Sequence, residues 1–359
     1  MSPEEKIYRE LQRHLDKQAV GFPATESGVE IRILQDYFKP AEAGLALYLS
    51  YEPQSVAEVS ARAGATGLSH ETIRQMLRNM ASHGAIGAGE KDGVDYYYTM
   101  PLLIGMVEWH GDATPQFGMD FGEYVSGEYG KAYAATKVSQ MRTIPVEQSI
   151  TVEHNVTTYD HIREIINTTE GPIAVNPCVC REGAKRRGEP CKQTSRLETC
   201  MTFGDWAKHF IREGTSRELT REEALGIIRQ NEEDGLVLQP TNYQNIDFVC
   251  SCCGCCCGVL KIQKSLPNPA ANWAHNYYAV VTEEDCTGCG TCVERCQMNA
   301  VTLDESRGVS VIDLDRCIGC GNCVVTCPSG ALRLGKSETE TVPPEQRTDL
   351  YALLSKRDQ

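Results

Sequence analysis

The feature that most constrains this chain is a cysteine pattern that occurs twice near the C-terminus, with a period of 31 residues. The segment DCTGCGTCVERCQMNAVTL (285–303) aligns with RCIGCGNCVVTCPSGALRL (316–334), and each copy contains C-x2-C-x2-C-x3-C. Three thiolates at this spacing can surround one corner of a cubane, while the glycines between them let the backbone approach the inorganic sulfides. The repeat therefore predicts two [4Fe–4S] clusters.

Over residues 279–335 the chain resembles the bacterial two-cluster ferredoxins, in which the fourth cysteine of each run ligates the other cluster. One departure is that Pro328 follows the last cysteine of the second run, whereas Gln297 follows that of the first. A zinc ribbon would need two C-x2-C knuckles, which fits the pattern less well. The resemblance implies one cluster on Cys286, Cys289, Cys292 and Cys327, and the other on Cys317, Cys320, Cys323 and Cys296.

A second cysteine-rich stretch, CSCCGCCCG (250–258), has six cysteines among nine residues. Cys250, Cys253 and Cys256 repeat the C-x2-C-x2-C spacing and suit a cubane corner. Cys252 and Cys255 are themselves three apart and suit a second metal site, and Cys257 is left over. Adjacent cysteines point in different directions, so we expect the loop to be divided between two sites.

One loop cannot complete two sites, and four cysteines precede it in the chain. A cluster with three plus one ligands and another with two plus two would use eight of these ten thiols and bring the total to about 16 irons. Buried cysteines without a metal role, or a single zinc ion on four of the thiols, are the alternatives. We expect one or two further [4Fe–4S] clusters, closed by Cys178, Cys180, Cys191 and Cys200.

Together, CVCREGAKRRGEPC…LETC, FVCSCCGCCCGVL and the C-terminal repeat resemble a group of cysteine-rich ferredoxin-domain proteins of anaerobic bacteria. The resemblance covers about residues 150–335, and a winged-helix-like N-terminus accompanies it. It implies a cytoplasmic iron–sulfur protein that moves electrons, and it names no substrate.

The first 177 residues contain no cysteine and are typical of a different kind of domain. A helix is expected from Pro3 to about Gln18, and Ser69 can cap a second helix, whose apolar residues recur at helical spacing. Asp92-Gly93 predicts a hairpin turn. This order of helices and hairpin resembles a winged helix, with residues on the presumed recognition helix that could meet DNA: Arg74, Gln75, Arg78 and Asn79.

The charge balance weighs against a DNA-binding role for this domain. Residues 1–100 hold 10 Lys and Arg against 14 Asp and Glu, whereas a DNA footprint is usually a basic patch. We therefore favour a dimerisation or docking module, and the first of these would make the chain a homo-oligomer through its N-terminal domain.

The expected architecture is an α+β chain of several domains. Residues 1–110 form the winged-helix-like domain, and 111–145 form a connector with a helix near Gly127 to Met141. Residues 146–275 form a small α/β metal-binding domain, with an extended segment at SITVEHNV (149–156) and a helix over 198–214. Residues 276–336 form the ferredoxin domain, and 337–359 a tail whose docking helix would place Leu350, Leu353 and Leu354 on one side.

Composition limits the cellular locations and the cysteine chemistry that we expect for this chain. The chain of 359 residues has no run of 18 apolar residues, and its N-terminus lacks the apolar core of a secretory signal. A cytoplasmic location keeps thiols reduced, so the 18 cysteines indicate metal or redox chemistry and not disulfides. The net charge of −14 opposes non-specific binding to nucleic acid or anionic membranes.

Three functions fit these features, and the first is favoured. The chain is expected to be an electron-transfer protein or subunit that passes single electrons through its clusters to a partner oxidoreductase. A redox-sensing transcription regulator and a reductase with a catalytic cluster in the middle domain are the alternatives. No haem, dinucleotide or nucleoside-triphosphate motif is present. A basic run beside the first cysteines, which could receive an acidic partner or anionic substrate, consists of Arg181, Lys185, Arg186 and Arg187.

Overall fold

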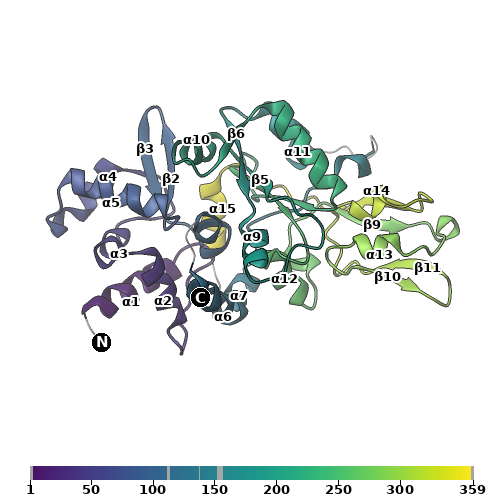
Figure 1. Ribbon diagram of the computed structural model, residues 1–359, viewed down its shortest axis with the longest axis horizontal. Coiled ribbons are helices and arrows are strands. Elements are labelled where there is room, and N and C mark those ends of the chain that lie inside the picture. Colours follow the sequence, from purple (N-terminus) through teal and green to yellow (C-terminus); the bar gives the residue numbers. More distant parts are fainter. Residues whose placement is uncertain (1–2, 111–113, 137, 152–156, 357–359) are drawn as a thin grey trace. The chain divides into compact units, whose positions relative to one another are not determined.

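The computed structural model describes residues 3–110, 114–136, 138–151 and 157–356, which form two compact units. The first unit contains residues 1–137 together with 347–359, and the second contains residues 138–346 (Figure 1). The C-terminal helix therefore belongs with the N-terminal residues. No helix in the described ranges combines the length and the apolar character needed to cross a bilayer.

The first unit is mainly helical and has one small antiparallel sheet of order β1-β3-β2. Its helices bury Leu11, Ile33 and Leu77 completely, so the amphipathic pattern of each helix faces a shared core. Its helices are α1 (Pro3–Asp16), α2 (Val29–Tyr37), α3 (Pro40–Ala46), α4 (Val56–Arg62), α5 (His70–Ser82), α6 (Pro115–Ser126), α7 (Glu128–Ala134) and α15 (Arg347–Leu354), and its strands are β1 (Gln54–Ser55), β2 (Gly87–Lys91) and β3 (Val94–Tyr98).

The elements expected around the hairpin are present. The Ser69 hydroxyl accepts a hydrogen bond from the Thr72 amide and caps α5. Asp92 and Gly93 both have positive φ, as a two-residue turn between β2 and β3 requires. The assignment of this region to the winged-helix class remains a prediction.

The second unit is built on a five-stranded antiparallel sheet of order β6-β4-β5-β8-β7. Helices α8 and α11 pack on this sheet through Ile162, Ile166 and Ile228, which share a core with Met201 and Val249. The elements of this part are α8 (Ile162–Thr168), β4 (Ile173–Pro177), α9 (Val179–Arg186), β5 (Glu198–Phe203), α10 (Gly204–Arg212), β6 (Arg217–Leu219), α11 (Arg221–Glu233), β7 (Val237–Pro240), β8 (Phe248–Cys252) and α12 (Gly258–Ser265).

The rest of the second unit consists of two short hairpin-like sheets and two short helices. Strands β9 (Tyr277–Val281) and β12 (Leu332–Lys336) pair antiparallel, as do β10 (Val301–Asp304) and β11 (Val309–Ile312). Helices α13 (Thr291–Arg295) and α14 (Asn322–Val325) each follow an N-cap glycine, Gly290 and Gly321, and these glycines occupy the same position in the two repeats. Single turns occur at Leu102–Met106 and Val107–Trp109 in the first unit, and at Glu147–Ser149, Thr158–Asp160, Ala270–Asn272 and Glu283–Asp285 in the second.

Several expected elements differ from the structure. The helix predicted over 198–214 is wrong in its first half, because Glu198–Phe203 is a strand between β4 and β8. Apolar and polar residues alternate over too short a stretch here to predict a strand. The conformation is decided by the buried position of this stretch between two neighbouring strands, β4 and β8. The expected connector helix is shorter, and Met141 instead makes a β-bridge with Thr241.

Two further expectations are modified. The extended segment at 149–156 lies largely outside the described residues, and Ser149 ends a single turn. The tail forms the expected helix, with Leu350 and Leu354 buried, but Leu353 is 39% exposed and does not share their face.

Candidate metal centres

The two C-terminal repeats form matching loops, and each loop has a position where only glycine fits sterically. Gly288 and Gly319 have positive φ, and a Cβ on Gly319 would lie 2.0 Å from the Tyr277 carbonyl oxygen. A Cβ on Gly288 would lie 2.5 Å from the Gly308 carbonyl oxygen. The loops can therefore follow this tight path only with glycine at these positions.

The outer set of cysteines combines residues from both repeats. Cys286, Cys289 and Cys292 of the first repeat line one hollow together with Cys327 of the second. Ser310 donates its backbone N–H to the Cys286 sulfur at 3.4 Å, and this hydrogen bond contributes most to lowering the pKa of Cys286. Cys289 is exposed to solvent. The structure thus places the fourth cysteine of one run beside the first three of the other.

The inner set has the complementary membership and is more deeply buried. Burial raises the pKa of Cys320 to about 12, and the next charges that raise it are those of Cys296 and Cys317. Cys323 is 8% exposed, and the charges that raise its pKa, after burial, include those of the same three thiols. Backbone amides approach this set too, since Ala279 donates to the Cys317 sulfur at 3.4 Å and Ala300 to the Cys296 sulfur at 3.2 Å.

The inner set adjoins the five-stranded sheet domain. The side-chain amide of Asn322, which precedes Cys323, donates to the carbonyl oxygens of Gly235 and Leu236 at 3.1 and 3.3 Å. Leu236 is completely buried and packs in one apolar cluster with Cys253 and Cys256, with Cys180 packed against it. Asn322 and Leu236 therefore connect the inner cysteine set to the cysteines of the middle region.

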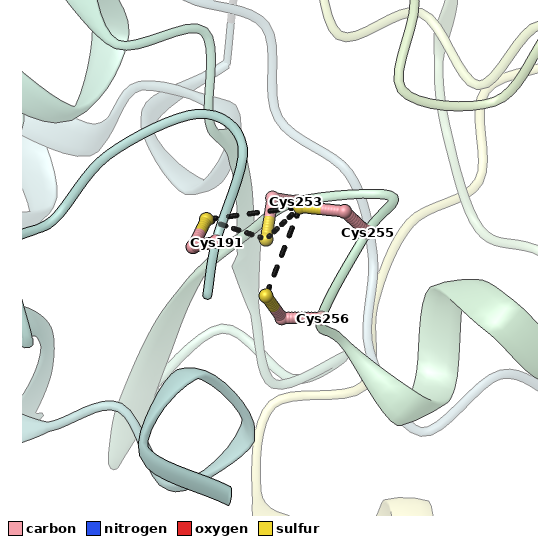
Figure 2. A group of neighbouring side chains, drawn as sticks. All are labelled: Cys191, Cys253, Cys255 and Cys256. Atoms are coloured by element: carbon pink, nitrogen blue, oxygen red, sulfur yellow. Dashed lines mark hydrogen bonds between the residues drawn. The ribbon is translucent and has the colours of Figure 1, made fainter. Parts of the chain in front are cut away.

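The middle region contains a compact four-thiol group made of Cys191, Cys253, Cys255 and Cys256 (Figure 2). Cys191 comes from the loop after α9, and the other three come from the loop after β8. The sulfur of Cys191 lies 3.5 Å from that of Cys253 and 3.7 Å from that of Cys255. The Cys255 sulfur lies 3.5 Å from that of Cys253 and 3.7 Å from that of Cys256, and all four sulfurs fall within 4.8 Å of one another.

Local hydrogen bonds favour the thiolate at Cys191. Although burial raises its pKa, backbone hydrogen bonds from Thr194 and Gln193 and the neighbouring thiols lower the pKa of Cys191 to about 7. Burial instead raises the pKa of Cys253 to about 12, and the charge of Arg181 opposes that change.

The remaining six middle-region cysteines form a second group, which we call the six-thiol ring. Side-chain contacts join them in a closed sequence in which each thiol has two thiol neighbours. The sheet explains part of this arrangement, because β5 pairs with β8 at Met201 and Val249, and the next pair in that register is Cys200 and Cys250. In order around the ring, the members are Cys178, Cys180, Cys257, Cys252, Cys250 and Cys200.

The cysteines of loop 250–258 are divided between two thiol groups, as expected, but the members of each group differ from those that the spacing predicted. Cys250 is separated from Cys253 and Cys256, and Cys252 is separated from Cys255. Cys257, which the spacing left unassigned, belongs to the ring. The strand β8 continues through Cys252, so alternation along the strand, and not the three-residue spacing, governs the first part of the loop.

Arg181 is buried, and its charge interacts with thiols of both middle-region groups. Its guanidinium donates to the Thr199 hydroxyl and, at 2.6 Å, to the Ser251 carbonyl oxygen. Although burial lowers its pKa, the charges of Cys178, Cys200, Cys253 and Cys252 raise the pKa of Arg181 above its ordinary value. The side chain therefore supplies a fixed positive charge to thiols of both groups.

The rest of the expected basic run behaves differently. Lys185, Arg186 and Arg187 are exposed, and Arg186 pairs with Glu182 at 3.3 Å. Arg181 is thus an internal cation. Sequence reasoning missed this role because it grouped Arg181 with the exposed basic residues that follow it and did not consider its spacing from them on α9.

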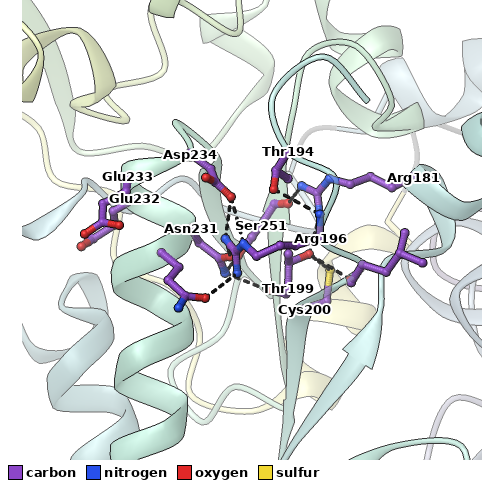
Figure 3. Close-up of polar contacts among 12 residues, drawn as sticks. Arg181, Thr194, Arg196, Thr199, Cys200, Asn231, Glu232, Glu233, Asp234 and Ser251 are labelled. Atoms are coloured by element: carbon purple, nitrogen blue, oxygen red, sulfur yellow. Dashed lines mark hydrogen bonds and ion pairs between the residues drawn. The ribbon is translucent and has the colours of Figure 1, made fainter. Parts of the chain in front are cut away.

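A polar network fixes the strands that carry the ring (Figure 3). Arg196 donates to Asp234 at 2.7 Å and to Asn231 at 2.8 Å, and Asn231 donates to the Ser251 hydroxyl at 2.7 Å and the Thr199 carbonyl oxygen at 2.9 Å. Helix α11 is thereby connected to β5 and β8.

Gln297, the residue that departs from the ferredoxin pattern, contacts the cysteine-rich loop directly. Its side-chain oxygen accepts a hydrogen bond from the Gly254 amide at 2.8 Å, and Gln297 is 4% exposed. A Cβ on Gly254 would lie 2.3 Å from the Gln297 carbonyl oxygen. A proline at 297 could not supply this acceptor, so the departure has a structural role.

The candidate DNA-contacting residues of α5 already have protein partners. Arg74 pairs with Glu71 and Arg78 with Asp95, both at 3.2 Å. The Gln75 amide donates to Asn79 at 2.8 Å. These contacts agree with the acidic balance of the domain and give no support to a DNA footprint.

Comparison with known proteins identifies one region. Residues 285–341 match the family model of the 4Fe-4S dicluster domain, which covers both cysteine repeats. No curated protein matches the chain. The C-terminal part is therefore a 4Fe–4S ferredoxin-type domain, and the crossed cysteine sets of the structure suit two such clusters.

Proposed function

We propose that this protein is an electron-transfer component that passes single electrons between a partner oxidoreductase and an iron–sulfur cluster in the middle region. The outer set would hold one [4Fe–4S] cluster on Cys286, Cys289, Cys292 and Cys327, and the inner set a second on Cys317, Cys320, Cys323 and Cys296. When bound, each such cluster accepts and releases one electron at a potential set by burial, charge and hydrogen bonds to sulfur.

The six-thiol ring would hold the further cluster. Its donors are cysteine sulfurs, the preferred ligands of iron–sulfur clusters, and four of the six are 9% exposed or less. Arg181 offsets the negative charge that thiolates and an added electron bring to this site. The exposed Cys289 makes the outer set the point of exchange with the partner.

The single observation that carries the relay is the contact at Leu236. Its carbonyl oxygen accepts a hydrogen bond from Asn322 beside the inner set, while its side chain belongs to an apolar cluster with Cys253 and Cys256, against which Cys180 of the ring packs. Leu236 and Asn322 are both completely buried, so this contact is shielded from solvent.

The relay is tested with the full chain, purified without oxygen and mixed rapidly with a one-electron reductant. Electron paramagnetic resonance of frozen time points should show the ferredoxin-type clusters reduced first and the ring cluster afterwards. A Cys296→Ser chain, with a damaged inner cluster, should reduce the ring cluster more slowly. Equal rates in both chains, or a middle region without redox-active iron, would contradict the proposal.

A further inference from the structure

The four-thiol group is much more compact than the ferredoxin-type sets. Four of its six sulfur–sulfur separations are 3.5, 3.7, 3.5 and 3.7 Å, and the other two are within 4.8 Å. Four thiolates arranged tetrahedrally around one zinc ion at about 2.3 Å are separated by about 3.8 Å. The group therefore has the dimensions of a site for one metal ion.

The ferredoxin-type sets show what a cluster site looks like in the same molecule. Within the described ranges, the four-thiol group is the one place where three or more ligand atoms lie within 4.8 Å of one another. The outer set instead surrounds a hollow. Four irons and their sulfides hold thiolates further apart than a single ion does, so the two kinds of site differ in size for a chemical reason.

We propose that Cys191, Cys253, Cys255 and Cys256 bind a single tetrahedral metal ion of the zinc class, in place of a second middle-region cubane. All four positions would be filled by protein thiolates, which is the arrangement of a structural zinc site and leaves no position for substrate. The buried Arg181 offsets part of the negative charge at the Cys253 sulfur. The Lys264 ammonium donates to the carbonyl oxygen of Gly254, between two of the ligands, at 3.4 Å.

The ion would give the cysteine-rich loop a fixed shape. It would join the loop after α9, through Cys191, to the loop after β8, and hold Gly254 between two of its ligands. Gly254 is the residue whose amide donates to Gln297. The metal would thus hold the surface against which the ferredoxin-type domain rests, while carrying no electron itself, because zinc has no redox chemistry in proteins. This inference does not depend on the relay.

The first test uses the full chain produced without oxygen, with both iron and zinc supplied and the clusters fully reconstituted. We expect about one zinc ion per chain to remain at full iron occupancy. X-ray absorption at the zinc edge should show four sulfur neighbours at about 2.3 Å. Zinc that disappears as iron occupancy rises would overturn the proposal, because it would then be a substitute for iron in a cluster site.

The second test separates this group from the ring. Cys191→Ser should remove the zinc and leave the iron content and the ferredoxin-type spectrum unchanged, which also reports that the chain has folded. Cys200→Ser, a matched change in the ring, should leave the zinc in place. If Cys191→Ser removes iron and the zinc content is unchanged or zero, the four thiols hold a cluster. Replacement of zinc by cobalt, with the strong visible bands of a tetrahedral thiolate complex, supplies a readout independent of any variant.

Discussion

At the scale of single residues, Arg181 and Gln297 show how neighbouring side chains support the cysteines. Arg181 supplies a positive charge near the thiols, and Gln297 contacts the cysteine-rich loop. Arg181 is 2% exposed and would be costly to bury without the thiolates around it. Gln297 replaces a proline of the repeat pattern and provides an acceptor that proline lacks. Neither residue is a metal ligand, yet both contact the segments that carry ligands.

Arg181→Gln should lower the reduction potential of the ring cluster, because loss of a nearby positive charge makes an added electron less favourable. The expected shift is on the order of tens of millivolts. Arg181→Lys should preserve most of the potential, and Arg186→Gln, on the exposed side of the same helix, should leave it unchanged. Redox titration followed by electron paramagnetic resonance measures all three. If Arg186→Gln shifts the reduction potential by the same amount, the effect does not depend on the buried position of Arg181.

Cys296→Ser should disturb the cluster of Cys317, Cys320 and Cys323, and Cys327→Ser should disturb that of Cys286, Cys289 and Cys292. The reason is the crossed grouping of the thiols, in which each fourth cysteine lies with the opposite repeat. Spectra of selectively reduced clusters distinguish the two variants. If Cys296→Ser damages the outer cluster and spares the inner one, the assignment of ligands is wrong.

At the scale of elements, the loop 250–258 connects β8 to α12 and serves two thiol groups at once. Its first part continues β8, and its second part turns so that Cys253, Cys255 and Cys256 converge. Gly254 lies at this turn with no room for a side chain, because the backbone of Gln297 is in contact with it. The loop therefore carries thiols of two candidate metal centres and also forms a contact surface for the ferredoxin-type domain.

Gly254→Ala should weaken the contact between the loop and the ferredoxin-type domain, since its Cβ would overlap the Gln297 carbonyl oxygen. We expect a loss of about 1–3 kcal/mol in the free energy of unfolding. Hydrogen exchange should show faster exchange near Gln297. Gly258→Ala is the matched control in the same loop, because a Cβ there meets no atom within 4 Å. Similar losses in the two variants would contradict the proposed contact.

At the scale of the whole molecule, all 18 cysteines lie in the second compact unit, and residues 1–137 with the C-terminal helix form a separate unit that contains none. The C-terminal helix returns to the first unit, where Tyr351 packs against Tyr51 and Ser355 accepts a hydrogen bond from the Ala19 amide at 2.8 Å. The C-terminal helix is thus part of the N-terminal unit, and we propose that this unit serves assembly or docking.

The full chain should bind DNA only weakly and with steep salt dependence, with dissociation constants no tighter than about 1 μM at physiological salt. The basic residues of α5 are paired with acidic ones, and the charge of the whole chain is −14. Fluorescence anisotropy over a range of salt concentrations measures this, and light scattering reports whether the chain is an oligomer. Sequence-specific binding at nanomolar concentration would instead favour a redox-sensing regulator.

Much of the ferredoxin-type domain is determined by the sequence alone. The spacing of the repeats places three thiols in each local loop, and the glycines allow the loop path. The crossed sets are expected from the resemblance to two-cluster ferredoxins and not from the spacing alone. Caps such as Ser69 and Thr220 are also local, since each hydroxyl accepts a hydrogen bond from an amide three residues away.

Only the tertiary structure decided how the ten middle-region cysteines are grouped. Spacing put Cys250 with Cys253 and Cys256, but Cys250 lies on β8 opposite Cys200, and that pairing depends on the register between strands almost 50 residues apart in the chain. The same long-range pairing makes Glu198–Phe203 a strand where local pattern favoured a helix. Local spacing describes the geometry of one loop, whereas a site made from several strands and loops depends on contacts that form only when the sheet does.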